Sequence, residues 1–187
     1  MKAVISYTEV VKSLINLIQI AGKFRLVDQS NREQKMDITD KDIKNLLLSL
    51  NKHQVKYILV GGFAVNIHGY HRTTNDLDLW IKEEEENTNR LIKALQENDI
   101  PGVEHLKGNK LVPGFTALTF GEKNFTIDLM NFLKAFKEAD FDEVYDRSLL
   151  AEFDGVTFQV IHKEDLIIEK KAASRHKDLD DLEHLTK

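Results

Sequence analysis

Cysteine is absent from this sequence of 187 residues, and so are long apolar runs. Without cysteine the chain can form neither disulfide bonds nor zinc sites built from thiolates. No segment has the roughly 20 consecutive apolar residues that a membrane-spanning helix needs. The apolar residues near the N-terminus are interrupted by polar ones such as Glu9, Lys12 and Gln19, which disfavours a signal peptide. We therefore expect a cytoplasmic protein that does not enter a membrane.

Positive charge is also in short supply. Lysine and arginine number 26 against 31 aspartate and glutamate residues, which gives a net charge of −5. This balance argues against broad, nonspecific binding of nucleic acids, although it allows a local basic groove. Hydrophobic residues make up 42% of the chain, which is enough for a proper core. The length suits one domain with at most a small helical appendage.

The most informative stretch of the chain spans residues 57–81. The apolar run 57–60 predicts a buried strand, and the short segment Phe63 to His68 after the glycine pair predicts a helix. Residues 76–81 read Asp-Leu-Asp-Leu-Trp-Ile and predict a second strand. Side chains alternate between the two faces of a strand, so Asp76 and Asp78 share one face while the leucines point into the core.

Two carboxylates held side by side on a rigid strand repel each other unless a cation lies between them. A third carboxylate, Asp128, lies in another alternating apolar run, residues 125–130. If that run pairs beside the strand of Asp76 and Asp78, three hard oxygen donors converge, and such donors suit Mg²⁺ or Mn²⁺. Two such ions about 4 Å apart can activate a hydroxyl and neutralise phosphates in an in-line displacement.

The succession of Gly61 and Gly62, then Asp76 and Asp78, then Asp128 resembles the nucleotidyltransferase superfamily with the polymerase-beta-like fold. The segments His-Gly-Tyr at 68–70 and Arg-Thr-Thr-Asn-Asp-Leu-Asp at 72–78 are similar to the minimal bacterial nucleotidyltransferases, including AbiEii-like toxins of toxin–antitoxin systems. The resemblance covers the chain from about Ile38 onward. It implies an α/β (α+β) fold, a mixed sheet flanked by helices with a C-terminal helical portion. Residues 1–36 then form an N-terminal helical extension and linker, and residues 37–187 the nucleotidyltransferase-like domain.

The resemblance also implies a reaction, the transfer of a nucleoside monophosphate from an NTP to an acceptor hydroxyl with release of pyrophosphate. Asp76 and Asp78 would hold the metals, and Asp128 would complete the first metal site and accept the proton of the acceptor. The acceptor stays open among RNA such as a tRNA end, a protein and a small molecule, and an antitoxin or other protein partner is conceivable. The residues expected to bind the nucleotide are Gly61, Gly62, Arg72, Thr73, Thr74 and Lys170.

The C-terminal run 165–185 carries a second motif, similar to the ending K-x-x-A-x-R-x-K-D-x-x-D-L of the same relatives. Alignment on Arg175 and Asp178 places the lysine of that motif at Lys170, which in relatives contacts the phosphates. Asp178 and Asp181 are one helical turn apart, and we expect them to hold Lys170 and Arg175 or to help bind the acceptor. The alternative is an ordinary surface helix with salt bridges.

One departure from the family pattern leaves the function open. Many nucleotidyltransferases have a serine after the first glycine, whereas this chain has Gly62 and then Phe63. A regulatory domain that binds a nucleotide or a partner without turnover is therefore an alternative to the enzyme. A metal-dependent phosphohydrolase that uses water is a third possibility. For His68 we favour packing over a role in a transition-metal site. For His71 we favour a phosphate contact or a place in an exposed turn.

Outside these motifs the pattern of apolar residues predicts further elements. In chain order they are a helix over 7–21, a linker over 28–35, a helix from the N-cap Thr39 to about His53, a helix opened by the acidic run 83–86 and ended at Pro101, a β-hairpin of 115–120 with 125–130, a segment 141–147 that resembles the family, a strand over 156–161 and helical structure over 165–185.

Overall fold

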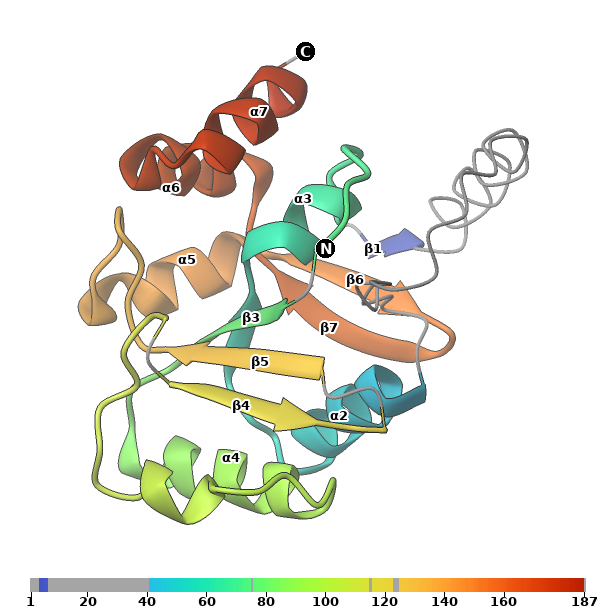
Figure 1. Cartoon of the computed structure of the whole chain (residues 1–187), viewed down its shortest axis with the longest axis vertical. Helices are drawn as coiled ribbons and strands as arrows, with labels where there is room; N and C mark the ends of the chain where they lie inside the picture. The colour runs from blue at the N-terminus through green and yellow to red at the C-terminus, as the bar shows by residue number, and fades with distance from the viewer. Residues whose placement is uncertain (1–3, 7–40, 75, 115, 123–124, 187) are drawn as a thin grey trace, which may run out of the picture.

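The strands of this protein form one mixed sheet covered by helices on both faces (Figure 1). A computed structural model describes residues 4–6, 41–74, 76–114, 116–122 and 125–186. Within these ranges the sheet has seven strands in the order β1-β6-β7-β2-β3-β5-β4. The elements are β1 (Val4–Ser6), α2 (Lys41–Lys52), β2 (Tyr57–Leu59), α3 (Gly61–Ile67), β3 (Asp76–Ile81), α4 (Glu85–Gln96), η1 (Val103–Leu106), β4 (Ala117–Phe120), β5 (Phe125–Met130), η2 (Glu138–Asp140), α5 (Phe141–Arg147), β6 (Leu149–Phe153), β7 (Val156–Val160), α6 (Lys163–Ala173) and α7 (His176–Leu185).

Strand β3 is an interior strand between β2 and β5, and its two faces have different surroundings. Leu77, Leu79 and Ile81 are fully buried. Helices α2 and α4 pack together on one side of the sheet, while α3, α6 and α7 lie on the other (Figure 1). The alternation predicted for this strand is therefore confirmed. Burying each such leucine or isoleucine contributes about 1.5–3 kcal/mol, which fixes the register of β3 and with it the position of both aspartates.

Most of the predicted elements are confirmed. The fold is the mixed α/β arrangement that the resemblance implied, and β4 pairs with β5 as an antiparallel hairpin. Helices form over 41–52, 85–96 and 141–147, and a strand forms over 156–160. No helix in the described part of the chain combines the length and the apolarity needed to cross a membrane. The predicted helix over 7–21 and the predicted N-cap Thr39 lie outside the described residues.

Four details differ from the prediction. Helix α3 begins at Gly61 rather than at Phe63, so both glycines belong to its first turn. The C-terminal run is two helices, since Ser174 adopts a left-handed conformation (φ 50°) that ends α6. Strand β6 follows α5 directly and pairs with β7, and its weak alternation gave no signal. Residues 4–6 add a parallel strand beside β6, a pairing that the sequence did not indicate.

Candidate active site

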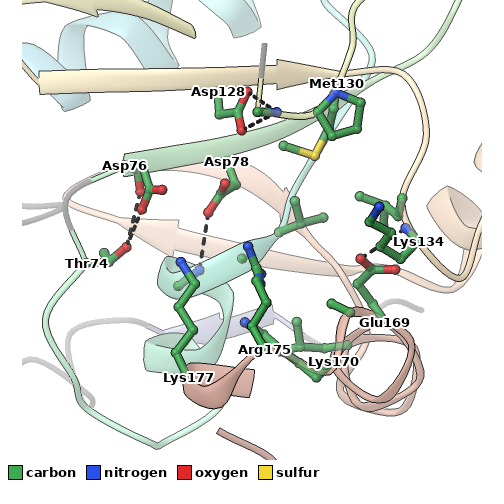
Figure 2. A pocket seen from close by; sticks show the side chains of 18 of the residues that line it. Thr74, Asp76, Asp78, Asp128, Met130, Lys134, Glu169, Lys170, Arg175 and Lys177 are labelled. Carbon is green, nitrogen blue, oxygen red and sulfur yellow. Dashed lines mark hydrogen bonds between the residues drawn. The ribbon is translucent and has the colours of Figure 1, made fainter. Parts of the chain in front are cut away.

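A cavity of about 390 Å³ lies between the sheet and the two C-terminal helices. Figure 2 shows Asp76, Asp78 and Asp128 on the sheet side and, reaching toward them, Arg175 from the N-cap of α7 and Lys177 from its first turn. The cavity brings together most of the residues predicted from the sequence, namely Gly61, Gly62, Arg72, Thr74, Asp76, Asp78, Asp128, Lys170 and Arg175. Three others lie outside it: Thr73 is exposed on the preceding loop, and Asp178 and Asp181 are buried behind Lys170.

The three carboxylates come from two neighbouring parallel strands. In the register of β3 and β5, Asp78 lies directly opposite Asp128. Adjacent strands are about 4.8 Å apart, so the two side chains project from the sheet as neighbours. Asp76 accepts a hydrogen bond from the Thr74 hydroxyl at 3.0 Å, and Asp128 accepts one from the backbone N–H of Gly114 at 2.9 Å. The strand pairing on which the predicted convergence of donors depended is therefore present.

Nearby positive charge does not fully compensate the charges of the three carboxylates. Burial and the charges of Asp76 and Asp128 raise the pKa of Asp78 to about 7, and the opposing charge of Lys177 is not enough to prevent it. Burial also raises the pKa of Asp128, with a further contribution from Asp76. The cluster is thus arranged so that a cation would relieve repulsion between the carboxylates.

The two glycines allow the first turn of α3 to approach this cluster closely. Gly61 has a φ of 61°, and a Cβ atom added to it would lie 1.8 Å from Oδ2 of Asp78. A Cβ atom on Gly62 would lie 2.4 Å from Oγ1 of Thr74. The backbone N–H of Gly62 donates a long hydrogen bond of 3.4 Å to Asp78. Phe63, where many relatives have serine, is 2% exposed and packs in the core.

Gly61→Ala is expected to destabilise the protein and to displace Asp78. The left-handed conformation alone costs an alanine about 1–2 kcal/mol, and the contact with Asp78 adds to this cost. Gly155→Ala is the matched control, because Gly155 also has a positive φ of 79° but no atom within 4 Å of the added Cβ. Urea unfolding of both variants measures the difference. Equal losses of stability would show that Asp78 does not need the space above Gly61.

Buried ion pairs hold the opposite wall of the cavity. Lys170, whose side chain is 3% exposed, places Nζ 2.9 Å from Asp178 and 2.7 Å from Asp181. Asp178 also accepts from Nε of Arg175 at 2.7 Å, and Asp181 accepts from Nη2 of Arg72 at 3.0 Å. Burial alone would raise the pKa of Asp178, but the hydrogen bonds from Arg175 and Lys170 hold it at about 2.

In this network the two aspartates contact Lys170 and Arg175, which agrees with one of the two roles predicted for them from the sequence. The phosphate contact predicted for Lys170 stays a prediction, since its ammonium group already contacts two carboxylates. Lys177 is a cation to which sequence reasoning gave no role. It is exposed, lines the cavity and points toward Asp78 (Figure 2), and its charge lowers the pKa of that group. Its only signal in the sequence was its place beside Asp178 in the C-terminal motif.

Side-chain contacts join the loop before β3 to α7. The rings of Tyr70 and His184 stack with centroids 3.8 Å apart, and the Tyr70 hydroxyl donates to Asp180 at 2.6 Å. Together with the pair of Arg72 and Asp181, these contacts make the loop and the helix one structural unit. His68 bonds through Nε2 to the carbonyl oxygen of Ile161 at 2.8 Å, which agrees with the predicted packing role.

The remaining part of the cavity is largely apolar. Its lining includes Val112 and Pro113 from the loop before β4, Met130 from β5, and Phe132. Glu169 lies at the far end and accepts hydrogen bonds from the backbone N–H groups of residues 134 and 135 at 3.1 and 2.8 Å. Neither the apolar wall nor Glu169 was among the predicted site residues. Glu169 stands within an ordinary helical run that gave no signal of its own.

A family model described as nucleotidyl transferase of unknown function (DUF2204) matches residues 39–187. This chain belongs to that family. The chain is therefore a nucleotidyltransferase, and the match begins close to the boundary that the sequence resemblance suggested. Among curated proteins, no sequence matches this member of the family significantly.

Solved structures of other nucleotidyltransferases share the fold of this DUF2204 member. The lincomycin-bound lincosamide antibiotic adenylyltransferase LnuA has 15% identity and a TM-score of 0.53, and the match covers 81% of this chain and 98% of that one. The antibiotic-resistance factor ANT(2″)-Ia has 15% identity and a TM-score of 0.54, covering 80% and 84%. A Thermotoga maritima protein assigned as a nucleotidyltransferase has 14% identity and a TM-score of 0.51, covering 83% and 96%. At these identities the likeness concerns the fold.

The acid cluster of this DUF2204 member fits a hard divalent cation. The donors are carboxylate oxygens, and burial together with the charges of Asp76 and Asp128 raises the pKa of Asp78. In the part of the chain that the structure describes, no group of three or more His, Cys, Asp or Glu side chains forms a ready-made metal cage. Mg²⁺ characteristically binds through one or two carboxylates while substrate phosphates and water complete its shell. The site is compatible with that mode of binding.

Proposed function

We propose that this protein transfers a nucleoside monophosphate from an NTP to an acceptor hydroxyl. The observation that carries the proposal is the cavity in which Asp76, Asp78 and Asp128 face Arg175 and Lys177. In the reaction a bond forms between the acceptor oxygen and the α-phosphorus, and the bond from that phosphorus to the bridging oxygen breaks. Pyrophosphate leaves, and the proton of the hydroxyl passes to the carboxylate of Asp128.

The sheet side of the cavity provides the acidic groups for this reaction. Asp76 and Asp78 would hold Mg²⁺ or Mn²⁺, which when bound would neutralise the charge of the phosphates. The hydroxyl of Thr74 orients Asp76 by donating to it. Gly61 and Gly62 keep the backbone of α3 close to the carboxylates and leave room for the phosphates. Asp128 lies on β5, next to the strand that carries Asp76 and Asp78, and acts as the base.

The helical side provides the positive charge. Arg175 and Lys177 reach into the cavity toward the aspartates, so they would contact the phosphate groups. Arg72 lines the cavity as well, and its bidentate pair with Asp181 fixes its guanidinium. Lys170 acts as a positioning residue, because it joins the two aspartates that hold Arg72 and Arg175. Thr73 is exposed outside the cavity and receives no role.

ATP is the first donor to test, since LnuA, a protein of this fold, is named an adenylyltransferase. The toxin role, an antitoxin partner and a cytoplasmic location stay predictions. The alternative of an inactive regulatory domain rested on Phe63. That residue lies in the core, so its side chain leaves the cavity free but supplies no hydroxyl in place of the serine.

Lys177→Ala is expected to weaken binding of a non-hydrolysable ATP analogue about tenfold, because an exposed cation opposite Asp78 is removed. Calorimetric titration with Mg²⁺ present measures the affinity. Since Lys177 makes no buried ion pair within the described part of the chain, the melting temperature should stay unchanged. Lys93→Ala on α4, across the sheet, is the matched control for losing an exposed lysine. Metal-independent binding, or equal binding by both variants, would contradict the proposed arrangement of the site.

A further inference from the structure

The apolar part of the cavity extends from the proposed base. Asp128 and Met130 share one face of β5, and Phe132 continues the same spacing beyond the end of the strand. Val112 and Pro113 line this part of the cavity from the preceding loop, next to Gly114, whose N–H bonds to Asp128. Val112 is a large apolar side chain that stays 37% exposed at the cavity. A ligand next to Asp128 would therefore meet carbon atoms on both sides.

On the neighbouring strand β3, the residue that follows Asp78 on the same face closes the cavity. Trp80 follows Asp78 on the same face of β3 but is fully buried. Its ring lies 6.0 Å from that of Phe136 and 5.3 Å from that of Phe141, which fills the space above this strand. The open path from the acid cluster therefore runs along β5. It leads toward Lys134 and Glu169 at the far end (Figure 2).

Positive charge is unevenly distributed around the three carboxylates. Lys177 and Arg175 interact electrostatically with Asp78, and Arg72 interacts with Asp76. Asp128, in contrast, accepts a hydrogen bond from the neutral N–H of Gly114, and Lys134 lies at the far end of the apolar path. The phosphate-binding charge thus lies on the side of Asp76 and Asp78 and not beside the proposed base.

This distribution restricts what can present a hydroxyl to Asp128. The acceptor oxygen must come within hydrogen-bond distance of the carboxylate. The terminal sugar of an RNA carries a phosphodiester close to its hydroxyl groups. That negative charge would lie beside the carboxylates of Asp128 and Asp78, in a protein of net charge −5. A neutral or positively charged compound meets no such repulsion, and an apolar face on it would bury Val112 and Met130.

We propose that the acceptor is a small hydroxyl compound, neutral or positively charged near the hydroxyl, that lays an apolar face along β5 between Asp128 and Phe132. This inference rests on the proposed nucleotidyl transfer. The cavity volume of about 390 Å³ falls in the range typical of small-molecule sites. The oxygen of the compound forms the new bond to the α-phosphorus, Asp128 takes its proton, and pyrophosphate leaves.

A matched set of alcohols tests the inference. The probes are three benzyl alcohols that carry a hydroxymethyl, an aminomethyl or a phosphomethyl group in the para position, together with a short single-stranded RNA with a free 3′-hydroxyl. The full-length protein is incubated with Mg²⁺ and the four NTPs labelled at the α-phosphate. Label should enter the neutral and aminomethyl alcohols at least tenfold faster than the phosphomethyl alcohol or the RNA.

Three outcomes would overturn the inference. They are preferential labelling of the RNA or the phosphomethyl alcohol, preferential labelling of an added protein, and labelling of no alcohol although metal-dependent nucleotide binding is present. A failure of the proposed function itself looks different. In that case nucleotide binding does not require Mg²⁺, and pyrophosphate is released with none of the acceptors.

A substitution of Val112 in the apolar part of the cavity adds a measurement that a general loss of activity would not change. Val112→Lys places a cation beside Asp128, so the ratio of labelling between the phosphomethyl and the aminomethyl alcohol should rise about tenfold. Leu48→Lys is the matched control, because Leu48 on α2 is a similarly exposed apolar residue, at 46%, away from the cavity. An unchanged ratio in Val112→Lys would show that this wall does not contact the acceptor.

Discussion

Replacing Asp78 with asparagine is expected to abolish nucleotidyl transfer while making the metal-free protein more stable above neutral pH. Asp78 lies opposite Asp128 in the sheet and beside Asp76, so its ionised form is held among like charges. Asparagine has the same shape but no charge, and it leaves one carboxylate fewer to hold the cation. Loss of such a ligand is expected to reduce the rate by about 10³-fold or more, comparable to removing other charge-stabilising groups from active sites.

The pH dependence of stability follows from the direction of the pKa shift. The pKa of Asp78 rises from 3.8 to about 7 on folding, so between these values the folded state binds the proton more tightly than the unfolded state. The stabilisation is fully present below pH 3.8 and is lost as the pH rises through about 7. A shift of this size corresponds to at most about 4 kcal/mol. We expect about half of that, because the side chain keeps some contact with water in the cavity.

Urea unfolding at about pH 8 and about pH 4.5 without metal would measure this difference. Asp78→Asn should exceed the wild type in stability at the higher pH and differ from it much less at the lower one. The control is Asp99→Asn, an exposed position with a φ of 53° that asparagine tolerates well. A loss of stability in Asp78→Asn at both pH values would assign Asp78 a structural role instead. Full activity in that variant would rule out the proposed metal ligand.

Replacing Lys170 with methionine is expected to cost about 3 kcal/mol of stability or more. Methionine fills a similar volume, but it leaves Asp178 and Asp181 buried without the ammonium group that bridges them. Each aspartate keeps one arginine partner, so the expected loss lies at the lower end of the range for broken buried pairs. Affinity for the nucleotide should fall together with stability, because Arg72 and Arg175 lose their fixed anchors.

Lys171→Met is a matched control, since Lys171 is the next residue of α6 and is exposed. It should change stability by only a few tenths of a kcal/mol. The pKa of Asp178 is about 2 in the folded protein and 3.8 ordinarily. Its contribution to stability is therefore complete above pH 3.8 and is lost as the pH falls toward 2. The difference between Lys170→Met and the wild type should shrink over that interval. A Lys170→Met protein of normal stability that binds no nucleotide would instead support direct phosphate contact by Lys170.

The sequence by itself determined the acid cluster to a large extent. The alternation of β3 placed Asp76 and Asp78 on one face, because a strand has a side-chain period of two and its leucines must be buried. The hairpin turn placed Asp128 on a strand of the right polarity, and the order of the motifs identified the superfamily. These features depend on local periodicity and on residue type, which can be read from one chain without its contacts.

Only the tertiary structure decided which positive groups face those acids. Lys170 and Lys177 both belong to the C-terminal motif, and nothing local distinguishes their roles. The left-handed turn at Ser174 folds α7 back on α6, which buries Lys170 between two aspartates and directs Lys177 into the cavity. The same is true of the bond from Gly114 to Asp128 and of the apolar path along β5. Whether a charge is buried and compensated depends on groups that are distant in sequence, so it is determined when the helices pack and not before.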